Sequence, residues 1–238
     1  MILSSLKVSL LIAALGLLAF APIQGQAAEE QNGFLYIGDS ISYGKLGQVI
    51  DTALRTISEN GVTEASCGSS PATWLTLPGQ PGHVYVKTVC GFWRKGETEE
   101  RVKVHNTPKI QEELQNLHPK LTIVQLGTNI AAGSHPLTQE ASVREMMQEI
   151  RAAGSQCIWI GPPDANSTVV TRDKLQITSE MIQTEASAQG CFYVATLSFT
   201  HFPAGPGDGI HPSPQLSAAW AQLILQKMLP TATEALHH

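Results

Sequence analysis

A serine follows directly after a short apolar run near the start of the chain. Residues 34–37 are apolar, Gly38 interrupts the run, and Ser40 stands where a helical pattern begins. A strand that ends at a glycine and passes into a helix can expose such a hydroxyl at the edge of a sheet. Far downstream, Asp208 and His211 place a carboxylate and an imidazole three residues apart. Serine, aspartate and histidine are the three side chains that an acyl-transfer site needs.

These three side chains have complementary chemistry. A serine hydroxyl is a weak nucleophile until a base removes its proton, and the imidazole of a histidine titrates close to neutral pH. A carboxylate at Asp208 would accept the second ring N–H of His211, hold its tautomer and stabilise the imidazolium. We therefore interpret Ser40 as the candidate nucleophile, His211 as its base and Asp208 as the partner of that base.

Three further groups could stabilise the oxyanion that forms when a serine attacks a carbonyl. The backbone N–H of Ser40 lies at a helix start, Gly68 has no side chain to obstruct its N–H, and Asn129 offers a side-chain amide. Singly, each has a common structural explanation, because serine is a frequent N-cap, and glycine and asparagine are frequent turn residues. Ser40 and Asn129 follow predicted strands, and Gly68 stands where we expect a further strand to end, so their joint occurrence favours the functional interpretation.

Strands and helices alternate along most of the chain, which is typical of an α/β protein with a parallel sheet covered on both faces. Such sheets hold their chemistry beyond the carboxyl ends of the strands, where the candidate residues stand. The apolar patterns predict strands over residues 34–37, 121–126, 157–160 and 192–194, and helices over residues 46–57, 110–117, 143–150 and 179–189, with a last helix from residue 213.

Residues 70–106 do not follow this alternation. They contain Pro71, Pro78 and Pro81, and residues 83–86 read as a strand, so we expect an insertion with β structure. The charged run 94–101 has mixed signs and predicts a solvated loop or the edge of a hairpin.

The motifs resemble those of the SGNH/GDSL hydrolase family. Residues 38–42 (Gly-Asp-Ser-Ile-Ser) resemble its first block, with isoleucine where leucine is usual, and Gly68 is the best match to the glycine of the second block. Residues 127–129 (Gly-Thr-Asn) resemble the third block, and residues 208–212 (Asp-Gly-Ile-His-Pro) resemble the last. The resemblance spans residues 34–228. The third block often continues with aspartate, where this chain has isoleucine, and the insertion has no counterpart in the minimal family pattern.

This resemblance implies a flavodoxin-like three-layer α/β/α sandwich with a mostly parallel five-stranded sheet. It also implies an ester hydrolase that needs no cofactor and no metal. Ser40 would be the nucleophile, His211 the base and Asp208 its partner. Ser40, Gly68 and Asn129 would form the oxyanion hole.

Other chemistries fit less well. The chain has no Gly-x-Ser-x-Gly elbow, no phosphate-binding loop and no His-Glu-x-x-His zinc motif. His201, Asp208 and His211 could in principle bind a metal ion, but that would leave Ser40 without a role. The formal net charge of −5 does not indicate the basic surface that nucleic-acid binding requires.

The first 27 residues read as an export signal. Lys7 precedes an almost wholly apolar run over residues 8–21, and residues 25–27 (Gly-Gln-Ala) provide small residues for cleavage. Cleavage would leave one domain over residues 28–238, in the periplasm or secreted, without stable membrane insertion. An uncleaved anchor is the alternative, although the apolar run is shorter than the ~20 residues that span a bilayer.

The four cysteines are consistent with export. We predict a disulfide between Cys67 and Cys90, which flank part of the insertion. Cys157 and Cys191 could form a second bond if their apolar runs are neighbouring strands, and buried free thiols are the alternative.

The sequence leaves several functions open. The first is an exported serine esterase acting on O-acetyl groups of envelope or extracellular carbohydrate, for which Trp74 and Trp93 could offer indole faces to sugars or simply pack in the core. A lipid-directed esterase such as a lysophospholipase or thioesterase, and acetyl transfer to a sugar, would use the same residues. The non-enzymatic alternative is a carbohydrate-binding module with a vestigial triad.

Overall fold

The computed structural model describes residues 33–76 and 86–237. The predicted signal over residues 1–27, and most of the predicted strand over residues 83–86, lie outside the described residues.

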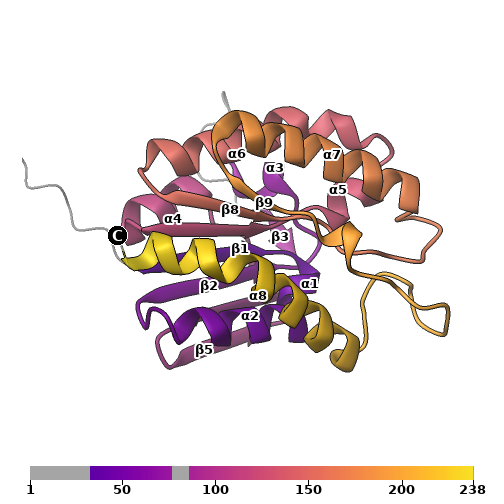
Figure 1. The fold of residues 1–238 in the computed structure, drawn as a ribbon, viewed down its shortest axis with the longest axis horizontal. Coiled ribbons are helices and arrows are strands. Elements are labelled where there is room, and N and C mark those ends of the chain that lie inside the picture. The colour runs from indigo at the N-terminus through magenta and orange to yellow at the C-terminus, as the bar shows by residue number, and fades with distance from the viewer. Residues whose placement is uncertain (1–32, 77–85, 238) are drawn as a thin grey trace, which may run out of the picture.

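A seven-stranded sheet in the order β5-β4-β2-β1-β7-β8-β9 forms the centre of the molecule (Figure 1). Five neighbouring strands are parallel, and their spatial order in the sheet, β2-β1-β7-β8-β9, is that of a flavodoxin-like sheet, with β1 between β2 and β7. The parallel strands are β1 (Phe34–Gly38), β2 (Gly61–Ser66), β7 (Leu121–Gln125), β8 (Gln156–Ile160) and β9 (Phe192–Val194).

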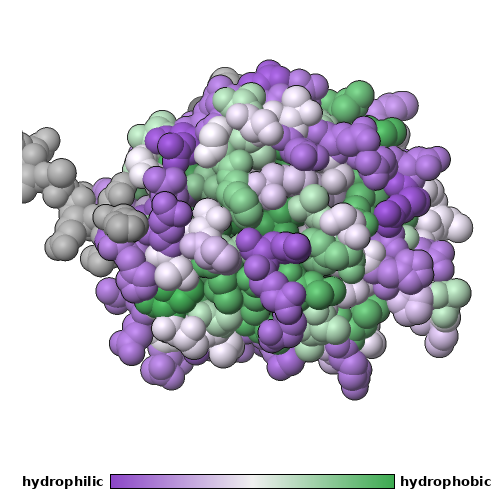
Figure 2. All heavy atoms as spheres, viewed as in Figure 1, coloured by the Kyte–Doolittle hydropathy of each residue, from purple (hydrophilic) through white to green (hydrophobic). Residues whose placement is uncertain are grey.

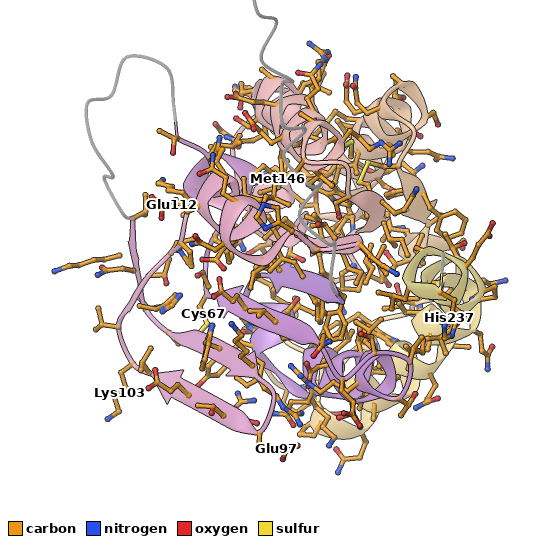
Figure 3. All side chains as sticks on the ribbon, turned by 90° about the vertical axis from the view of Figure 1, so that its left-hand side faces the viewer. Cys67, Glu97, Lys103, Glu112, Met146 and His237 are labelled. Atoms are coloured by element: carbon orange, nitrogen blue, oxygen red, sulfur yellow. A yellow bond between two sulfur atoms is a disulfide. The ribbon has the colours of Figure 1, made fainter. Side chains whose placement is uncertain are left out.

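The prediction of a five-stranded sheet is therefore wrong in number, and the insertion explains the difference. Its hairpin of β4 (Gly91–Lys95) and β5 (Thr98–Val102) pairs antiparallel with the free edge of β2. All five residues of β5 are exposed, which matches the charged hairpin edge expected from the sequence. A separate two-stranded sheet joins β3 (Lys87–Thr88) to β6 (His105–Asn106). Figure 3 shows Glu97 and Lys103 of this region projecting away from the helical layers.

Helices cover both faces of the sheet, which confirms the predicted three-layer α/β/α sandwich. All five residues of β1 are buried, as expected for a central parallel strand, and successive side chains point to opposite faces. Phe34 and Tyr36 pack in the cluster that contains the inner faces of α2 (Lys45–Arg55) and α8 (Pro214–His237).

The opposite face of β1 presents Leu35 and Ile37 to a second cluster. That cluster includes buried side chains of α4 (Ile110–Leu117), α6 (Glu140–Ala152) and α7 (Arg172–Gln189).

Helix α7 begins seven residues before the predicted start of that helix at residue 179, because Thr171 caps it by accepting a hydrogen bond from the Lys174 N–H. On the face formed by α2 and α8, hydrophobic residues reach the surface among hydrophilic ones (Figure 2). Among the described helices, none combines the length and the apolar character needed to span a bilayer.

Candidate active site

Ser40 is the first residue of α1 (Ser40–Tyr43), the short helix that follows β1. Asp39 caps this helix, because its Oδ1 accepts the Ile41 N–H at 2.9 Å. A side chain at Gly38 would not fit, since its Cβ would lie 1.9 Å from Ser42 Oγ. The turn from strand to helix therefore leaves Ser40, which is half-buried, at the carboxyl edge of the sheet.

A polar cluster lies in the core beneath this turn. Ser42 Oγ donates to Gln125 Oε1 at 2.8 Å, and the buried Tyr36 hydroxyl donates to the same oxygen. Gln125 is the last residue of β7, so the cluster ties the start of α1 to the neighbouring strand. The apolar periodicity of the sequence gave no signal for these buried polar contacts.

The structure brings Ser40, His211 and Asp208 together in one chain of hydrogen bonds. Ser40 Oγ lies 2.9 Å from His211 Nε2, and His211 Nδ1 lies 2.6 Å from Asp208 Oδ2. The other carboxylate oxygen of Asp208 accepts the backbone N–H groups of Ile210 and His211, both at 2.8 Å. The carboxylate is thereby fixed in the orientation in which it meets the imidazole.

The charge of Asp208 is stabilised by this environment. Partial burial raises the pKa of its carboxyl, but the hydrogen bonds from the His211 side chain and from the backbone of His211 and Ile210 outweigh that effect and lower the pKa to about 2. Asp208 is therefore ionised at neutral pH and can stabilise a positive charge on His211.

A contact with a neighbouring loop holds the loop that carries Asp208 and His211. Gly209 has φ +70°, and a Cβ there would lie 1.9 Å from the Asn166 carbonyl oxygen. The Asn166 N–H donates to the Gly209 carbonyl at 2.7 Å. Asn166 follows β8, and the sequence offered no motif that would have assigned it this supporting role.

The predicted oxyanion donors stand after three neighbouring strands. Gly68 follows β2 with φ +79°, a conformation that favours glycine, and it is exposed. Asn129 lies in α5 (Thr128–Ala132) after β7, and its Nδ2 donates to Asp39 Oδ2 at 3.1 Å and to the Ser69 carbonyl at 3.0 Å. Asn129 thus touches the immediate neighbours of Ser40 and Gly68, so the three segments converge at one edge of the sheet.

Asp39 is a buried carboxyl group inside this arrangement. Burial raises its pKa to about 7, although hydrogen bonds from Ile41 and Asn129 and the positive charge of His211 oppose the rise. The site therefore contains two carboxyl groups with opposite pKa shifts, the ionised Asp208 and the more readily protonated Asp39.

Both cysteine pairs considered from the sequence, the predicted one and the possible one, are disulfides in the structure. Cys67 is joined to Cys90, as predicted, and links the segment before Gly68 to the start of β4. Cys157 is joined to Cys191, which rules out the alternative of free thiols for that pair.

The two tryptophans of the insertion differ in exposure. Trp74, at the end of α3 (Pro71–Trp74), is completely buried, so its ring packs in the core and offers no face to a sugar. Trp93 on β4 is half-buried and packs against the same core.

The insertion also contacts the helix that carries Ser40. Arg101 on β5 donates to the Tyr43 carbonyl at 2.9 Å, and its guanidinium lies 4.9 Å from the ring centre of Tyr43 and 4.4 Å from that of Phe92. The hairpin therefore braces the end of α1.

Comparison with known sequences agrees with the sequence motifs. The GDSL-like lipase/acylhydrolase family matches residues 36–219. Protein BcsX of Komagataeibacter xylinus is 26% identical over 173 residues, which are 71% of this chain and 65% of BcsX. The match thus spans slightly less than two thirds of that relative.

Several solved structures share the fold. TesA has a TM-score of 0.56 at 18% identity and covers 86% of this chain and 100% of its own. The lipase/acylhydrolase from Enterococcus faecalis has a TM-score of 0.54 at 14% identity, with 84% and 97% covered. A variant of Axe2, an acetyl-xylooligosaccharide esterase from Geobacillus Stearmophilus, has a TM-score of 0.55 at 15% identity, with 83% and 94% covered.

The family match covers most of the chain, and the fold is that of SGNH hydrolases. The protein is therefore a member of the GDSL-like lipase/acylhydrolase family and an enzyme of the esterase or acylhydrolase type.

Proposed function

We propose that the protein is an exported serine esterase that hydrolyses acyl esters through Ser40, His211 and Asp208. The observation that carries this proposal is the chain of hydrogen bonds from Ser40 Oγ through both ring nitrogens of His211 to Asp208. Its order is the one that a nucleophile, a base and an orienting carboxylate require.

The first half of the reaction forms an acyl-enzyme. Ser40 Oγ attacks the ester carbonyl carbon while His211 Nε2 takes the hydroxyl proton, and Asp208 stabilises the imidazolium. Collapse of the tetrahedral intermediate breaks the ester C–O bond, and His211 returns the proton to the leaving alcohol. A water molecule then attacks the acyl-enzyme with His211 again acting as base, which releases the acid and regenerates Ser40.

The oxyanion of the tetrahedral intermediate would receive hydrogen bonds from the backbone N–H groups of Ser40 and Gly68 and from the Asn129 amide. Both N–H groups of that amide already have acceptors, Asp39 Oδ2 and the Ser69 carbonyl. Asn129 would therefore serve the oxyanion by sharing an N–H between two acceptors, an arrangement that tightens as negative charge develops.

Short acyl groups on a large alcohol are the substrate class that we favour, with O-acetyl groups on envelope or extracellular carbohydrate as the proposed case. The side chains of His211 and Asp208 are 49% and 52% exposed, so the site is open to a bulky leaving group. The fold is shared with an acetyl-xylooligosaccharide esterase, which supports the proposal by analogy only. Complete burial of Trp74 removes one of the reasons that the sequence suggested.

A lipid-directed esterase is the second candidate, favoured by exposed apolar residues in the insertion. Val89 and Val104 are 80% and 65% exposed, and Val86 is 43% exposed. Exposed apolar side chains are the feature that a lipid-directed site would use to receive an acyl chain.

A chain-length series of p-nitrophenyl esters separates the two candidates. The acetyl proposal predicts the highest kcat/KM for acetate, whereas a maximum at eight or more carbons would contradict it and favour a lipid substrate. Acetate release from acetylated xylan oligosaccharides by the wild type, and its loss in Ser40→Ala, would then support hydrolysis of a carbohydrate ester. Acetylated sugar acceptor in excess of free acetate would instead identify a transferase.

We propose the periplasm or the exterior of the cell as the site of action. The two disulfides support this location, because such bonds persist mainly in oxidising compartments. Amino-terminal sequencing of the protein recovered from its native compartment tests it. A start near Ala28 supports export with cleavage, and retention of residues 1–27 contradicts it.

A further inference from the structure

Ser69 connects the three segments that would provide the oxyanion donors. It is 0% exposed and directly follows Gly68. Its hydroxyl accepts the Trp74 Nε1–H at 3.0 Å and donates to the Gly38 carbonyl at 3.4 Å. Its own carbonyl accepts the Asn129 amide at 3.0 Å.

Each of these contacts reaches a different part of the site. Gly38 lies two residues before Ser40, at the end of β1, and Asn129 lies just after β7. Ser69 itself follows β2, on the other side of β1. A single buried residue therefore links the ends of three adjacent strands through hydrogen bonds.

We propose that Ser69 is a positioning residue that sets the geometry of the oxyanion hole. This inference rests on the proposed function, in which Ser40, Gly68 and Asn129 stabilise the oxyanion. Ser69 touches neither substrate nor oxyanion in this account. It holds the peptide of Gly68, the amide of Asn129 and the strand end before Ser40 in one mutual arrangement.

The contact with Trp74 gives the Ser69 hydroxyl a defined direction. A hydroxyl has one hydrogen, and the indole N–H can only donate. Since the oxygen of Ser69 accepts from Trp74, its hydrogen is left for the Gly38 carbonyl. Trp74 is itself fixed, because it is completely buried and ends a helix whose Thr73 hydroxyl accepts the Ser70 N–H at 3.1 Å.

The contact with Asn129 restricts the orientation of the amide. An amide NH₂ group is planar, and its two hydrogens here meet acceptors on opposite segments, Asp39 Oδ2 and the Ser69 carbonyl. With both directions occupied, rotation of the amide would break a hydrogen bond. Ser69 thus contributes to preorganisation, which is the source of the catalytic effect of oxyanion donors.

The test compares Ser69→Ala with the wild type in steady-state hydrolysis of p-nitrophenyl acetate. Loss of the hydroxyl frees the Gly38 carbonyl and the Trp74 indole, so we expect kcat to fall at least about tenfold while KM changes by less than about twofold. Phenylboronic acid, which forms a tetrahedral adduct with an activated serine, should bind at least about tenfold more weakly for the same reason.

Ser155→Ala is the matched control. Ser155 is also 0% exposed, and its hydroxyl lies 2.8 Å from Thr122 Oγ1. It directly precedes β8, however, and so lies at the amino ends of the parallel strands, away from Ser40 at their carboxyl ends. This variant loses a comparable buried hydrogen bond and should keep kcat and boronate affinity. Assays at a temperature well below the melting temperature of every variant, checked by circular dichroism, separate positioning from loss of fold.

Trp74→Phe is the second variant, and it tests whether Ser69 positions the oxyanion donors if Ser69→Ala does not fold. It retains Ser69 but removes the donor that orients its hydroxyl, so kcat and boronate affinity should fall by about threefold or more with KM preserved. Unchanged kcat in the folded variants, or an equal fall in Ser155→Ala, would overturn the role of Ser69. If the proposed esterase function itself is wrong, the wild type will neither hydrolyse the ester nor bind the boronate, which distinguishes that outcome from the absence of a role for Ser69.

Discussion

At the residue scale, two carboxyl groups within one site have opposite pKa shifts because their surroundings differ. Asp208 is half-exposed and accepts three hydrogen bonds, from His211 Nδ1 and from two backbone N–H groups, which favour its charged form. Asp39 is 1% exposed, and burial favours its neutral form. This contrast supports the proposed role of Asp208 in charge stabilisation, and the hydrogen bond from Asn129 Nδ2 to Asp39 Oδ2 supports a role for Asp39 in holding the Asn129 amide.

Replacement of Asp208 by asparagine tests the orienting role of the carboxylate. Asp208→Asn would preserve the size of the side chain but remove the charge that stabilises the His211 imidazolium and selects its tautomer. We expect kcat/KM to fall by about 10³- to 10⁴-fold, as in other sites of this type. Asp173→Asn, at an exposed position in the first turn of α7, is the control and should retain full activity. Equal activity in both variants would contradict the role of Asp208.

Replacement of Asp39 by asparagine tests the support of Asn129. The new oxygen can still cap α1, but its NH₂ group would then face the NH₂ group of Asn129, so two donors would oppose each other. We expect kcat to fall about tenfold with little change in KM. An increase in KM with unchanged kcat in steady-state assays would show that Asp39 acts on substrate binding instead.

At the element scale, the ends of β1, β2 and β7 position the candidate site. In a sheet of this order the crevice between β1 and β7 is the switch point, where connections leave in opposite directions and ligands bind. Ser40 follows β1 and Asn129 follows β7, so the nucleophile and an amide donor lie on either side of that point.

The two disulfides differ in their distance along the chain from Gly68, so their removal separates an effect on stability from an effect on activity. Cys67→Ser/Cys90→Ser and Cys157→Ser/Cys191→Ser should each lower the free energy of unfolding by about 2–4 kcal/mol, because the loops they close span 23 and 34 residues. Only the first pair adjoins Gly68, so only that double variant should also show a lower kcat at a temperature where both are folded. Urea denaturation and esterase assays measure the two effects, and equal kcat values for the two variants would contradict the link between the disulfide and the oxyanion hole.

Several elements could be predicted from the sequence because their patterns are local. The apolar run before Gly38 and the run over residues 121–126 are short, buried and followed by turn residues, so both strands and the residues after them were found. The hairpin of β4 and β5 was expected only as a charged edge, because its pairing with β2 is a long-range contact. Ser69 and Asn166 could not be assigned, since their roles arise from contacts between loops that are distant in the sequence.

At the scale of the whole molecule, buried acidic groups make stability depend on pH. Glu64 on β2 is 3% exposed, and burial together with the nearby charge of Glu113 raises the pKa of Glu64 well above its ordinary value. A raised pKa means that the folded state binds more protons than the unfolded state. The stability from this group is therefore present below the ordinary glutamate pKa of about 4.3 and is lost as pH rises through the folded-state pKa.

Glu64→Gln removes this titration while keeping the shape of the side chain. We expect the free energy of unfolding at pH 8 to increase by about 1–3 kcal/mol relative to the wild type, with a much smaller change at pH 4. Urea denaturation at the two pH values measures the difference. A variant that is less stable than the wild type at pH 8 would show that Glu64 is ionised and favourably paired in the folded protein.

The proposed reaction requires that Ser40 is an activated nucleophile. Mass spectrometry after incubation with a fluorophosphonate probe tests it most directly, since such a probe forms a covalent bond only with a serine whose proton a base can remove. We predict one adduct on the peptide that contains Ser40, strongly slowed labelling in Asp208→Asn, and none in Ser40→Ala. Absence of an adduct in the folded wild-type protein, or an adduct that persists in Ser40→Ala, would contradict the account.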